Sequence, residues 1–282
     1  MNQAAEPTWP PIAPPMRDTL DMTFTRALAL LALVSVPAGA QNGWKLVWSD
    51  DFNGPARTAP DSTKWNYDLG ATGWGNRELE NYTKSLDNAS LDGNGNLVIQ
   101  ALKAGDSYTS ARLKTQGLYT FTYGKIEARL KIPFGQGIWP AFWLLGENGK
   151  RGGWPRCGEI DIMENIGREP EMVHATVHGP GYSGGKGIGE RYILTEGKRF
   201  ADDFHVYSVV WNPDNLEFFM DGKSYHKLAK SGIPDGTEWV FDHPFFIILN
   251  VAVGGQWPGN PDESSRFPQQ MLVDYVRVYQ AQ

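Results

Sequence analysis

Three carboxylates, Glu159, Asp161 and Glu164, lie within six residues of one another in the sequence Gly-Glu-Ile-Asp-Ile-Met-Glu that starts at Gly158. Like charges held this close raise one another's pKa, so one carboxyl can stay protonated beside an ionised neighbour. An acid next to a carboxylate is what cleavage of a glycosidic bond requires. A row of solvated acids on an edge strand, or a calcium site, is the alternative that spacing alone leaves open.

The spacing of the three acids predicts the element that carries them. Glu159 and Asp161 alternate with two isoleucines, which is the period of a half-buried strand. Glu164 follows Glu159 by five positions and has the wrong parity for the same face, and in a helix positions five apart diverge by about 140°. A β-bulge with Met163 as the extra residue restores the parity. We expect a bulged strand whose two glutamate carboxyls lie about 5–5.5 Å apart, as in a retaining glycosidase.

Several flanking motifs accompany this strand. They are Trp139-Pro-Ala-Phe-Trp-Leu-Leu-Gly146, Trp154-Pro155, His174-Ala-Thr-Val-His-Gly-Pro-Gly-Tyr-Ser183, Val253-Gly-Gly-Gln-Trp-Pro-Gly-Asn-Pro-Asp262 and Phe267-Pro-Gln-Gln-Met-Leu-Val-Asp-Tyr-Val-Arg-Val-Tyr279. Together with the acid motif they resemble glycoside hydrolase family 16, and the bulged form of that motif resembles the laminarinases, which are endo-1,3-β-glucanases. The resemblance covers roughly residues 44–280.

The resemblance implies a fold and a mechanism. The fold is a β-jelly roll whose concave sheet forms the substrate cleft. Glu159 would be the nucleophile, Glu164 the general acid/base, and Asp161 the residue that orients the nucleophile. The expected activity is retaining endo-hydrolysis of laminarin-like β-1,3-glucan. Alternatives are mixed-linkage β-1,3-1,4-glucan, a galactan such as agar or carrageenan, or a non-catalytic glucan-binding protein of the same fold.

Sugars present flat C–H faces rimmed by hydroxyls, so a glucan site needs aromatic plates beside polar groups. The substrate-binding candidates are Trp139, Trp143, Trp154, Trp257, His178, Asn76, Glu78 and Arg112. For any single tryptophan or histidine, packing in the structure is the alternative interpretation. For Asn76, Glu78 and Arg112 the alternative is an ordinary solvated surface.

Metal binding is expected only in a structural role. No group of histidines and cysteines has zinc spacing, so we expect no cofactor for catalysis. The family resemblance implies a structural Ca²⁺ held by Asp51, the carbonyl of Gly93 and Asp274. Oxygen ligands suit calcium, but hydrogen bonding and turn formation account for the same three residues equally well.

The remaining segments, which position these residues, are predicted to be strands. Alternating or nearly all-apolar runs cover 96–102, 125–132, 205–211, 216–220, 223–228, 245–253 and 272–279, separated by turn residues such as Asp221-Gly222. No convincing helical period occurs after residue 40. We therefore predict an all-β fold, a β-sandwich of two antiparallel sheets, formed by a single catalytic domain over residues 41–282.

The first forty residues have a different character. Residues 1–15 are rich in proline and lack a hydrophobic period, so we expect a disordered head. Arg17 and Arg26 then precede an apolar run over residues 27–34, and Ala38-Gly-Ala40 supplies a cleavage site before Gln41. A basic flank, a short apolar core and small residues at the cut define a secretory signal peptide. We expect a secreted protein, extracellular or periplasmic, that is free of the membrane after the signal is removed.

Net charge and cysteine content restrict the partners and the disulfide bonds that this chain can have. The net charge is −6 and no basic cluster recurs, so a nucleic-acid partner is not expected. The single cysteine, Cys157, allows no internal disulfide and reads as a packed residue. We expect a monomer whose partner is a β-glucan polysaccharide.

Overall fold

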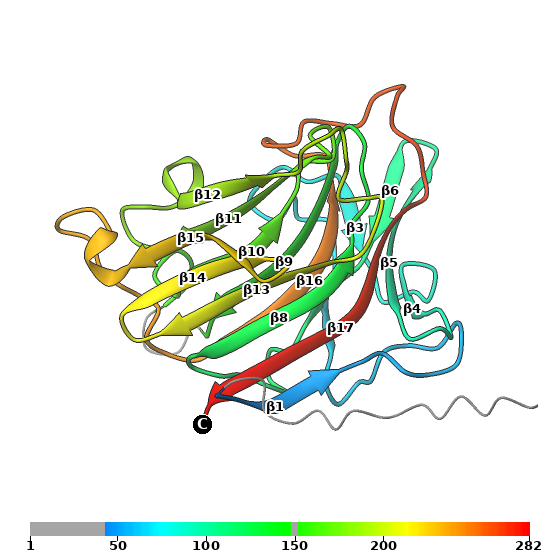
Figure 1. The fold of residues 1–282 in the computed structure, drawn as a ribbon. Coiled ribbons are helices and arrows are strands. Elements are labelled where there is room, and N and C mark those ends of the chain that lie inside the picture. Colours follow the sequence, from blue (N-terminus) through cyan, green and yellow to red (C-terminus); the bar gives the residue numbers. More distant parts are fainter. Residues whose placement is uncertain (1–42, 148–151) are drawn as a thin grey trace, which may run out of the picture. The chain divides into compact units, whose positions relative to one another are not determined.

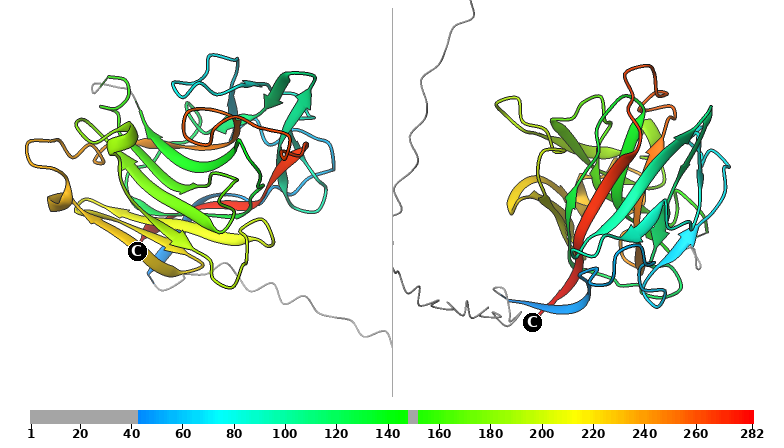
Figure 2. Two further views of the ribbon diagram at one scale, coloured as in Figure 1. Left: turned by 90° about the horizontal axis from the view of Figure 1, so that it is seen from above. Right: turned by 90° about the vertical axis from the view of Figure 1, so that its right-hand side faces the viewer.

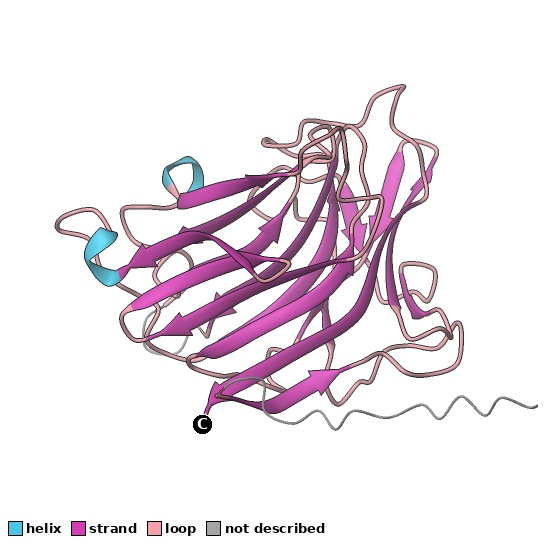
Figure 3. Ribbon diagram, viewed as in Figure 1, coloured by secondary structure: helices cyan, strands magenta, loops and turns pink. Residues whose placement is uncertain are grey.

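The computed structural model describes residues 43–147 and 152–282, which form two stacked β-sheets joined by loops (Figures 1 and 3). The predicted disordered head and signal peptide, residues 1–40, lie outside these described residues. Two short 3₁₀ turns, Gly184–Lys186 and Lys230–Gly232, interrupt the strands. Within the described ranges, no helix has the length and apolar character needed to cross a membrane.

The larger sheet comprises β1 (Trp44–Asp50), β3 (Glu80–Tyr82), β4 (Ala89–Leu91), β5 (Leu97–Ala104), β6 (Ser107–Ser110), β8 (Gly124–Lys131), β13 (His205–Asn212), β14 (Asn215–Met220), β15 (Lys223–Ala229) and β17 (Gln269–Ala281). The strand order is β15-β14-β13-β8-β17-β5-β6-β3, with β1 beside β17 and β4 beside β5. The final strand therefore lies inside the sheet and ties the first strand to it.

The smaller sheet comprises β2 (Asn66–Asp68), β7 (Arg112–Lys114), β9 (Ile138–Gly146), β10 (Glu159–Glu164), β11 (Met172–His178), β12 (Ile188–Ile193) and β16 (Phe245–Val253). Its order is β12-β11-β10-β9-β16-β7-β2, which places β10 between β11 and β9. Among the described strands, all pairings are antiparallel except that of β3 with β6. The prediction of an all-β sandwich is confirmed.

The long strands form where the sequence predicts them. β8 buries Ile126, Ala128 and Leu130 completely, because these alternate residues face the other sheet. All nine residues of β16 are buried, as expected for an apolar strand in the middle of a sheet. The predicted hairpin between β14 and β15 turns at Asp221 and Gly222, whose φ angles of 47° and 77° match the left-handed backbone of tight hairpins.

The two sheets enclose one hydrophobic core. Both contribute to it: Ile126 of β8 and Val273 of β17 come from the larger sheet, and Phe142 of β9 and Ile160 of β10 from the smaller one. The sheets are strongly twisted and curved, as the two views of Figure 2 show. Because the inner face of β10 is held in this core, its outward side chains are positioned by a rigid layer rather than by a loop.

Candidate active site

The register of β10 against β11 shows which face the three acids occupy. Glu159 lies opposite His178, Asp161 opposite Thr176, and Glu164 opposite a third residue of β11, His174. These partners are two residues apart in an unbroken strand, so they share one face. The three carboxylates therefore project together from the outer face of the smaller sheet. We call the outer surface of β9, β10 and β11 the acid face.

A β-bulge makes this arrangement possible, as the sequence predicts, although the residue without a partner in β9 is Ile162 and not Met163. Against β9, Asp161 pairs with Trp143 and Met163 with Phe142, so Ile162 is left without a partner in the register. The bulge thus occupies Ile162 and Met163, and both side chains are buried in the core. Each such burial stabilises the fold by roughly 1.5–3 kcal/mol. The extra residue therefore anchors the bulge while it returns Glu164 to the outer face.

The position immediately before β10, residue 158, accepts only glycine. Gly158 has a φ of +74°, which favours glycine, and a Cβ added there would lie 2.9 Å from Phe245 Cζ and 3.0 Å from Val240 Cγ2. The neighbouring Cys157 is fully buried, and burial raises its pKa to about 11. It is therefore a packed thiol, as predicted, and this segment fixes the start of the strand that carries Glu159.

Burial raises the pKa of all three acids, and repulsion by neighbouring carboxylates adds to this for Glu159 and Glu164. The pKa of Glu159 rises to about 8, first through burial and then through Asp161, while His178, Arg112 and a hydrogen bond with Trp154 act in the opposite direction. Asp161 and Glu164 have pKa values well above the ordinary ones, mainly because of burial, and Glu164 is also repelled by the other two acids. The cluster therefore holds at least one proton near neutral pH.

His178 lies directly beside two of the acids. Its Nε2 atom is 3.6 Å from Glu159 Oε1 and 3.2 Å from Asp161 Oδ2. The side chains of these three residues are 4–18% exposed, so solvent screens their interactions only weakly. His178, a predicted substrate-binding residue, therefore contacts Glu159 and Asp161.

Trp139 and Trp257 border the other end of the acid face. Trp139 Nε1 donates a hydrogen bond to Glu164 Oε1 at 3.0 Å, and its ring meets that of Trp257 edge to face at 5.4 Å. The ring of His174 also contacts Trp257, at 5.1 Å. Trp257 is 36% exposed, so part of its ring is available to a ligand beside Glu164.

Trp154 is the most accessible of the four predicted tryptophans. It is 51% exposed, its ring centroid lies 6.3 Å from that of His178, and it hydrogen-bonds with Glu159. The two most exposed aromatic candidates, Trp154 and Trp257, thus lie near opposite ends of the row of acids. This placement fits a chain-like ligand lying along β10.

Trp143 is held on the outer face by two neighbours. Its Nε1 donates to Asn250 Oδ1 at 2.8 Å, and the guanidinium of Arg112 lies 4.7 Å from its ring centroid. The same guanidinium lies 4.8 Å from the ring of Trp74, and Arg112 Nε is 3.0 Å from Asp68 Oδ2. Arg112 therefore stacks on the indole of Trp143 and contributes positive charge near Glu159.

Asn76 and Glu78 belong to a chain of hydrogen bonds that ends at Trp143. Asn250 Nδ2 donates to Tyr82 Oη at 3.2 Å, Tyr82 Oη donates to Glu78 Oε2 at 3.2 Å, and Asn76 Nδ2 donates to Glu78 Oε1 at 2.9 Å. The predicted pair is therefore connected to the acid face through β16 and β9. It is not an isolated surface decoration.

Sequence reasoning missed three residues of this region. Tyr82 and Asn250 were not singled out because each lies in a short or otherwise apolar strand without a distinctive motif. His174 was not among the predicted site residues, although its spacing of four from His178 in an alternating strand places both on one face. The parity of β11 was the signal that could have identified His174.

Two of the residues predicted to hold calcium, Asp51 and Asp274, form ion pairs with arginines. Asp51 Oδ1 accepts a hydrogen bond from Arg277 Nη2 at 2.6 Å, and Asp274 Oδ2 accepts one from Arg129 Nη1 at 2.7 Å. Each arginine contacts one oxygen of its carboxylate, and a carboxylate can bind calcium through a single oxygen. A calcium site at Asp51, Gly93 and Asp274 stays a prediction.

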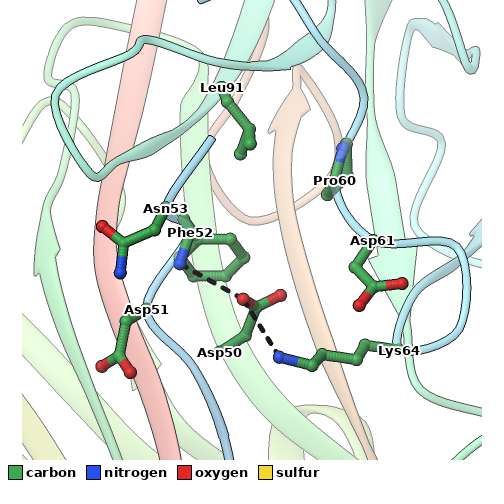
Figure 4. Close-up of a pocket in the computed structure, with 8 residues that line it drawn as sticks. All are labelled: Asp50, Asp51, Phe52, Asn53, Pro60, Asp61, Lys64 and Leu91. Carbon is green, nitrogen blue, oxygen red and sulfur yellow. Dashed lines mark hydrogen bonds and ion pairs between the residues drawn. The ribbon is translucent and has the colours of Figure 1, made fainter. Parts of the chain in front are cut away.

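A cavity of about 240 Å³ lies away from the acid face, beside the end of β1 (Figure 4). Asp50, Asp51, Asp61 and Lys64 line it, with Lys64 Nζ 3.4 Å from Asp50 Oδ1. Trp65 Nε1 also donates to Asp50 Oδ2 at 2.8 Å. These interactions give Asp50 a structural role that joins β1 to the following loop.

Comparisons with known proteins agree with this geometry. The family described as glycosyl hydrolases family 16 matches residues 77–277. The crystal structure of the laminarinase catalytic domain from Thermotoga maritima is 50% identical, with a TM-score of 0.79, and the match covers 85% of this chain and 99% of that one. A beta-glucanase from Rhodothermus marinus is 42% identical over 250 residues, which are 84% of this chain and 85% of the relative. A glucan endo-1,3-beta-glucosidase A1 from Niallia circulans is 39% identical, and this chain spans 38% of its length.

Proposed function

The chain belongs to glycosyl hydrolases family 16, and from this membership we propose that it hydrolyses β-1,3-glucan, cutting within the polymer with retention of configuration. The bulge in β10 is the single observation on which the proposal depends, because it brings Glu164 to the same face as Glu159 and Asp161. The printed names of the similar proteins support a glucan substrate. Exposed aromatic rings beside the acids suit a sugar chain.

The neighbours of the two glutamates suggest how their roles divide. Three interactions favour ionised Glu159, those with His178, Arg112 and Trp154, whereas Glu164 has two, with His178 and Trp139. Glu159 therefore ionises first and serves as the nucleophile, while Glu164 keeps the proton that the leaving group needs. Asp161, hydrogen-bonded to Glu159, orients that carboxylate.

The proposed reaction has two steps. In the first, a Glu159 carboxylate oxygen attacks the anomeric carbon, the bond to the leaving oxygen breaks, and Glu164 transfers its proton to that oxygen. The product is a glycosyl ester of Glu159 and a shortened glucan. In the second, ionised Glu164 removes a proton from water, whose oxygen attacks the anomeric carbon and releases Glu159. Two inversions leave the β configuration unchanged.

Azide rescue distinguishes the two glutamates. In Glu159→Ala, azide replaces the nucleophile in one displacement, so a β-linked aryl glycoside yields an α-glycosyl azide. In Glu164→Ala the glycosyl ester still forms, and azide releases it as a β-glycosyl azide. Proton NMR identifies either product. Glu190→Ala, on exposed β12 of the same sheet, serves as the control and should retain full hydrolysis. A fully active Glu159→Ala variant would end the assignment.

The substrate and the destination of the protein need separate tests. Reducing-sugar release from laminarin, lichenan, agar and carrageenan, with product sizing, should be greatest for laminarin; preferential release from lichenan or a galactan would support the alternatives instead. Secretion as a monomer is part of the proposal. N-terminal sequencing of secreted protein should begin at Gln41, and sedimentation should give a single-chain mass.

A further inference from the structure

Two carboxylates and one imidazole on the acid face lie close enough to bind a common ion. One ligand atom from each of Glu159, Asp161 and His178 lies within 4.8 Å of the other two. Among the described residues, this is the only group of three or more histidine, cysteine or acidic side chains with that property. The carboxylates approach from β10 and the imidazole from β11, so the core of the sandwich holds all three.

Hydrogen bonding leaves part of this donor set unused. Asp161 is only 3% exposed, yet its Oδ2 atom has no hydrogen-bond partner among the described residues. His178 Nε2 approaches that oxygen to 3.2 Å without the geometry of a hydrogen bond. A buried carboxylate oxygen without a partner is costly unless a ligand satisfies it. This oxygen is therefore an independent indication that the group accepts a cation.

The two distances from the imidazole fit a small divalent ion. A tetrahedral Zn²⁺ with ligand bonds of about 2.0–2.1 Å requires its ligand atoms to be roughly 3.3–3.4 Å apart. His178 Nε2 lies 3.2 Å from Asp161 Oδ2 and 3.6 Å from Glu159 Oε1, values on either side of this separation. Ca²⁺ and Mg²⁺ prefer oxygen ligands alone, so the imidazole favours ions of the zinc class.

We propose that Glu159, Asp161 and His178 bind a divalent cation of the zinc class, which excludes glucan from the acid face while it is bound. The three side chains supply three ligands, and the solvent side of the group leaves a fourth position for water. The inhibitory consequence rests on the proposed function, since the ion occupies the proposed nucleophile. The binding of the ion itself does not depend on the proposed function.

Isothermal titration of untagged, EDTA-treated protein with ZnCl₂ tests the site directly. Wild type should bind one ion per chain, and His178→Gln and Asp161→Asn should each weaken binding at least about 10-fold. His205→Gln is the matched control, because His205 Nδ1 forms a single histidine–carboxylate pair with Asp221 at 2.8 Å in the other sheet. It should bind as wild type does. Zinc binding that is absent in wild type, or unchanged in His178→Gln, overturns the proposal.

A spectrum of the wild-type protein protects the test against variants that fail to fold. Co²⁺ in place of zinc should give the intense visible bands of a four-coordinate site, and Zn²⁺ should abolish them. Octahedral bands alone would overturn the proposal. CaCl₂ and MgCl₂ should not displace Co²⁺, and displacement by either would contradict the selectivity argued from His178.

Kinetics separate the failure of this proposal from failure of the proposed function. At a free Zn²⁺ concentration 100 times its Kd, the apparent KM for laminarin should rise about 100-fold with kcat unchanged. His178-dependent zinc binding in a protein without hydrolytic activity would sustain the metal site and refute the proposed function. Full hydrolysis without zinc binding would refute the metal site and sustain the proposed function.

Discussion

Replacing Glu80 by glutamine should make the protein more stable at neutral and alkaline pH. Glu80 is fully buried in β3, where one carboxylate oxygen accepts a hydrogen bond from the Val253 amide at 2.6 Å. Burial, and then the charge of Glu78 and a hydrogen bond with it, raise the pKa of Glu80 to about 9. The folded protein therefore keeps a proton on Glu80 that the unfolded chain loses near its ordinary value of 4.5.

The sign and size of the effect follow from this pKa difference. A group whose pKa is raised by folding contributes stability that is complete below its unfolded pKa and is lost as pH rises through the folded value. For Glu80 this window runs from 4.5 to about 9. One proton changes the free energy of unfolding by about 1.4 kcal/mol per pH unit, so roughly 3 kcal/mol is lost between pH 5.5 and 7.5.

Glu80→Gln should remove this loss. The amide keeps an oxygen for Val253 and cannot ionise, so between pH 5.5 and 7.5 the variant should gain roughly 3 kcal/mol of stability relative to wild type. Urea unfolding followed by tryptophan fluorescence at both pH values measures the difference. The raised pKa values of Glu159, Asp161 and Glu164 act in the same direction, but they are common to both proteins and cancel.

Glu217→Gln is the matched control for this experiment. A hydrogen bond from Ser224 is the largest influence on Glu217 and holds its pKa below the ordinary value, so its stability window lies below pH 4.5. Between pH 5.5 and 7.5 this variant should follow wild type. Parallel pH profiles for wild type and Glu80→Gln would show that Glu80 is ionised in the folded protein, and the reasoning from its burial would fail.

Three further predictions concern the acid face. A Cβ on Gly187 would lie 2.4 Å from His178 Cε1, so Gly187→Ala should displace the imidazole and lower kcat/KM at least ~10-fold. Gly185→Ala is the control: a Cβ there meets nothing within 4 Å, so kcat/KM should be unchanged. Trp139→Phe removes a hydrogen bond that lowers the pKa of Glu164, so the basic limb of the kcat/KM profile should move to higher pH; a shift to lower pH would contradict this assignment. Deleting Met163 should abolish hydrolysis in protein that circular dichroism shows to be folded, because Glu164 then turns toward the core; a folded, active deletion variant would refute the role of the bulge.

The sequence predicted those features that depend on short stretches of chain. The bulge followed from the parity of three acids in β10, and the burial pattern of β8 followed from strict alternation. The nearly all-apolar run of β16 likewise indicated a central strand. Short strands such as β2 and β7, with three residues each, lack enough length for a period to appear and were not predicted.

Contacts between distant segments could not be predicted in the same way. Trp143 is predicted to be an aromatic plate for sugar, and its ring is stacked against Arg112 and bonded to Asn250, which lies 107 positions away. Asn250 in turn reaches Tyr82 across 168 positions. These contacts arise from the order β9-β16-β7 in the sheet, which the local pattern does not specify.

The same limit applies to the division of roles between the two glutamates. Crowding within β10 implies that one acid keeps a proton, but it does not determine which one. Glu159 is favoured as the anion by Arg112 of β7 and by Trp154 of the preceding loop, whereas Glu164 is bonded to Trp139 of β9. The contacts from β7, from β9 and from the loop before β10 therefore determine which glutamate carries the proton. Substitutions that exchange the contacts of Glu159 with those of Glu164, with the motif in β10 intact, should move the proton from one glutamate to the other. The two catalytic roles should then be exchanged as well.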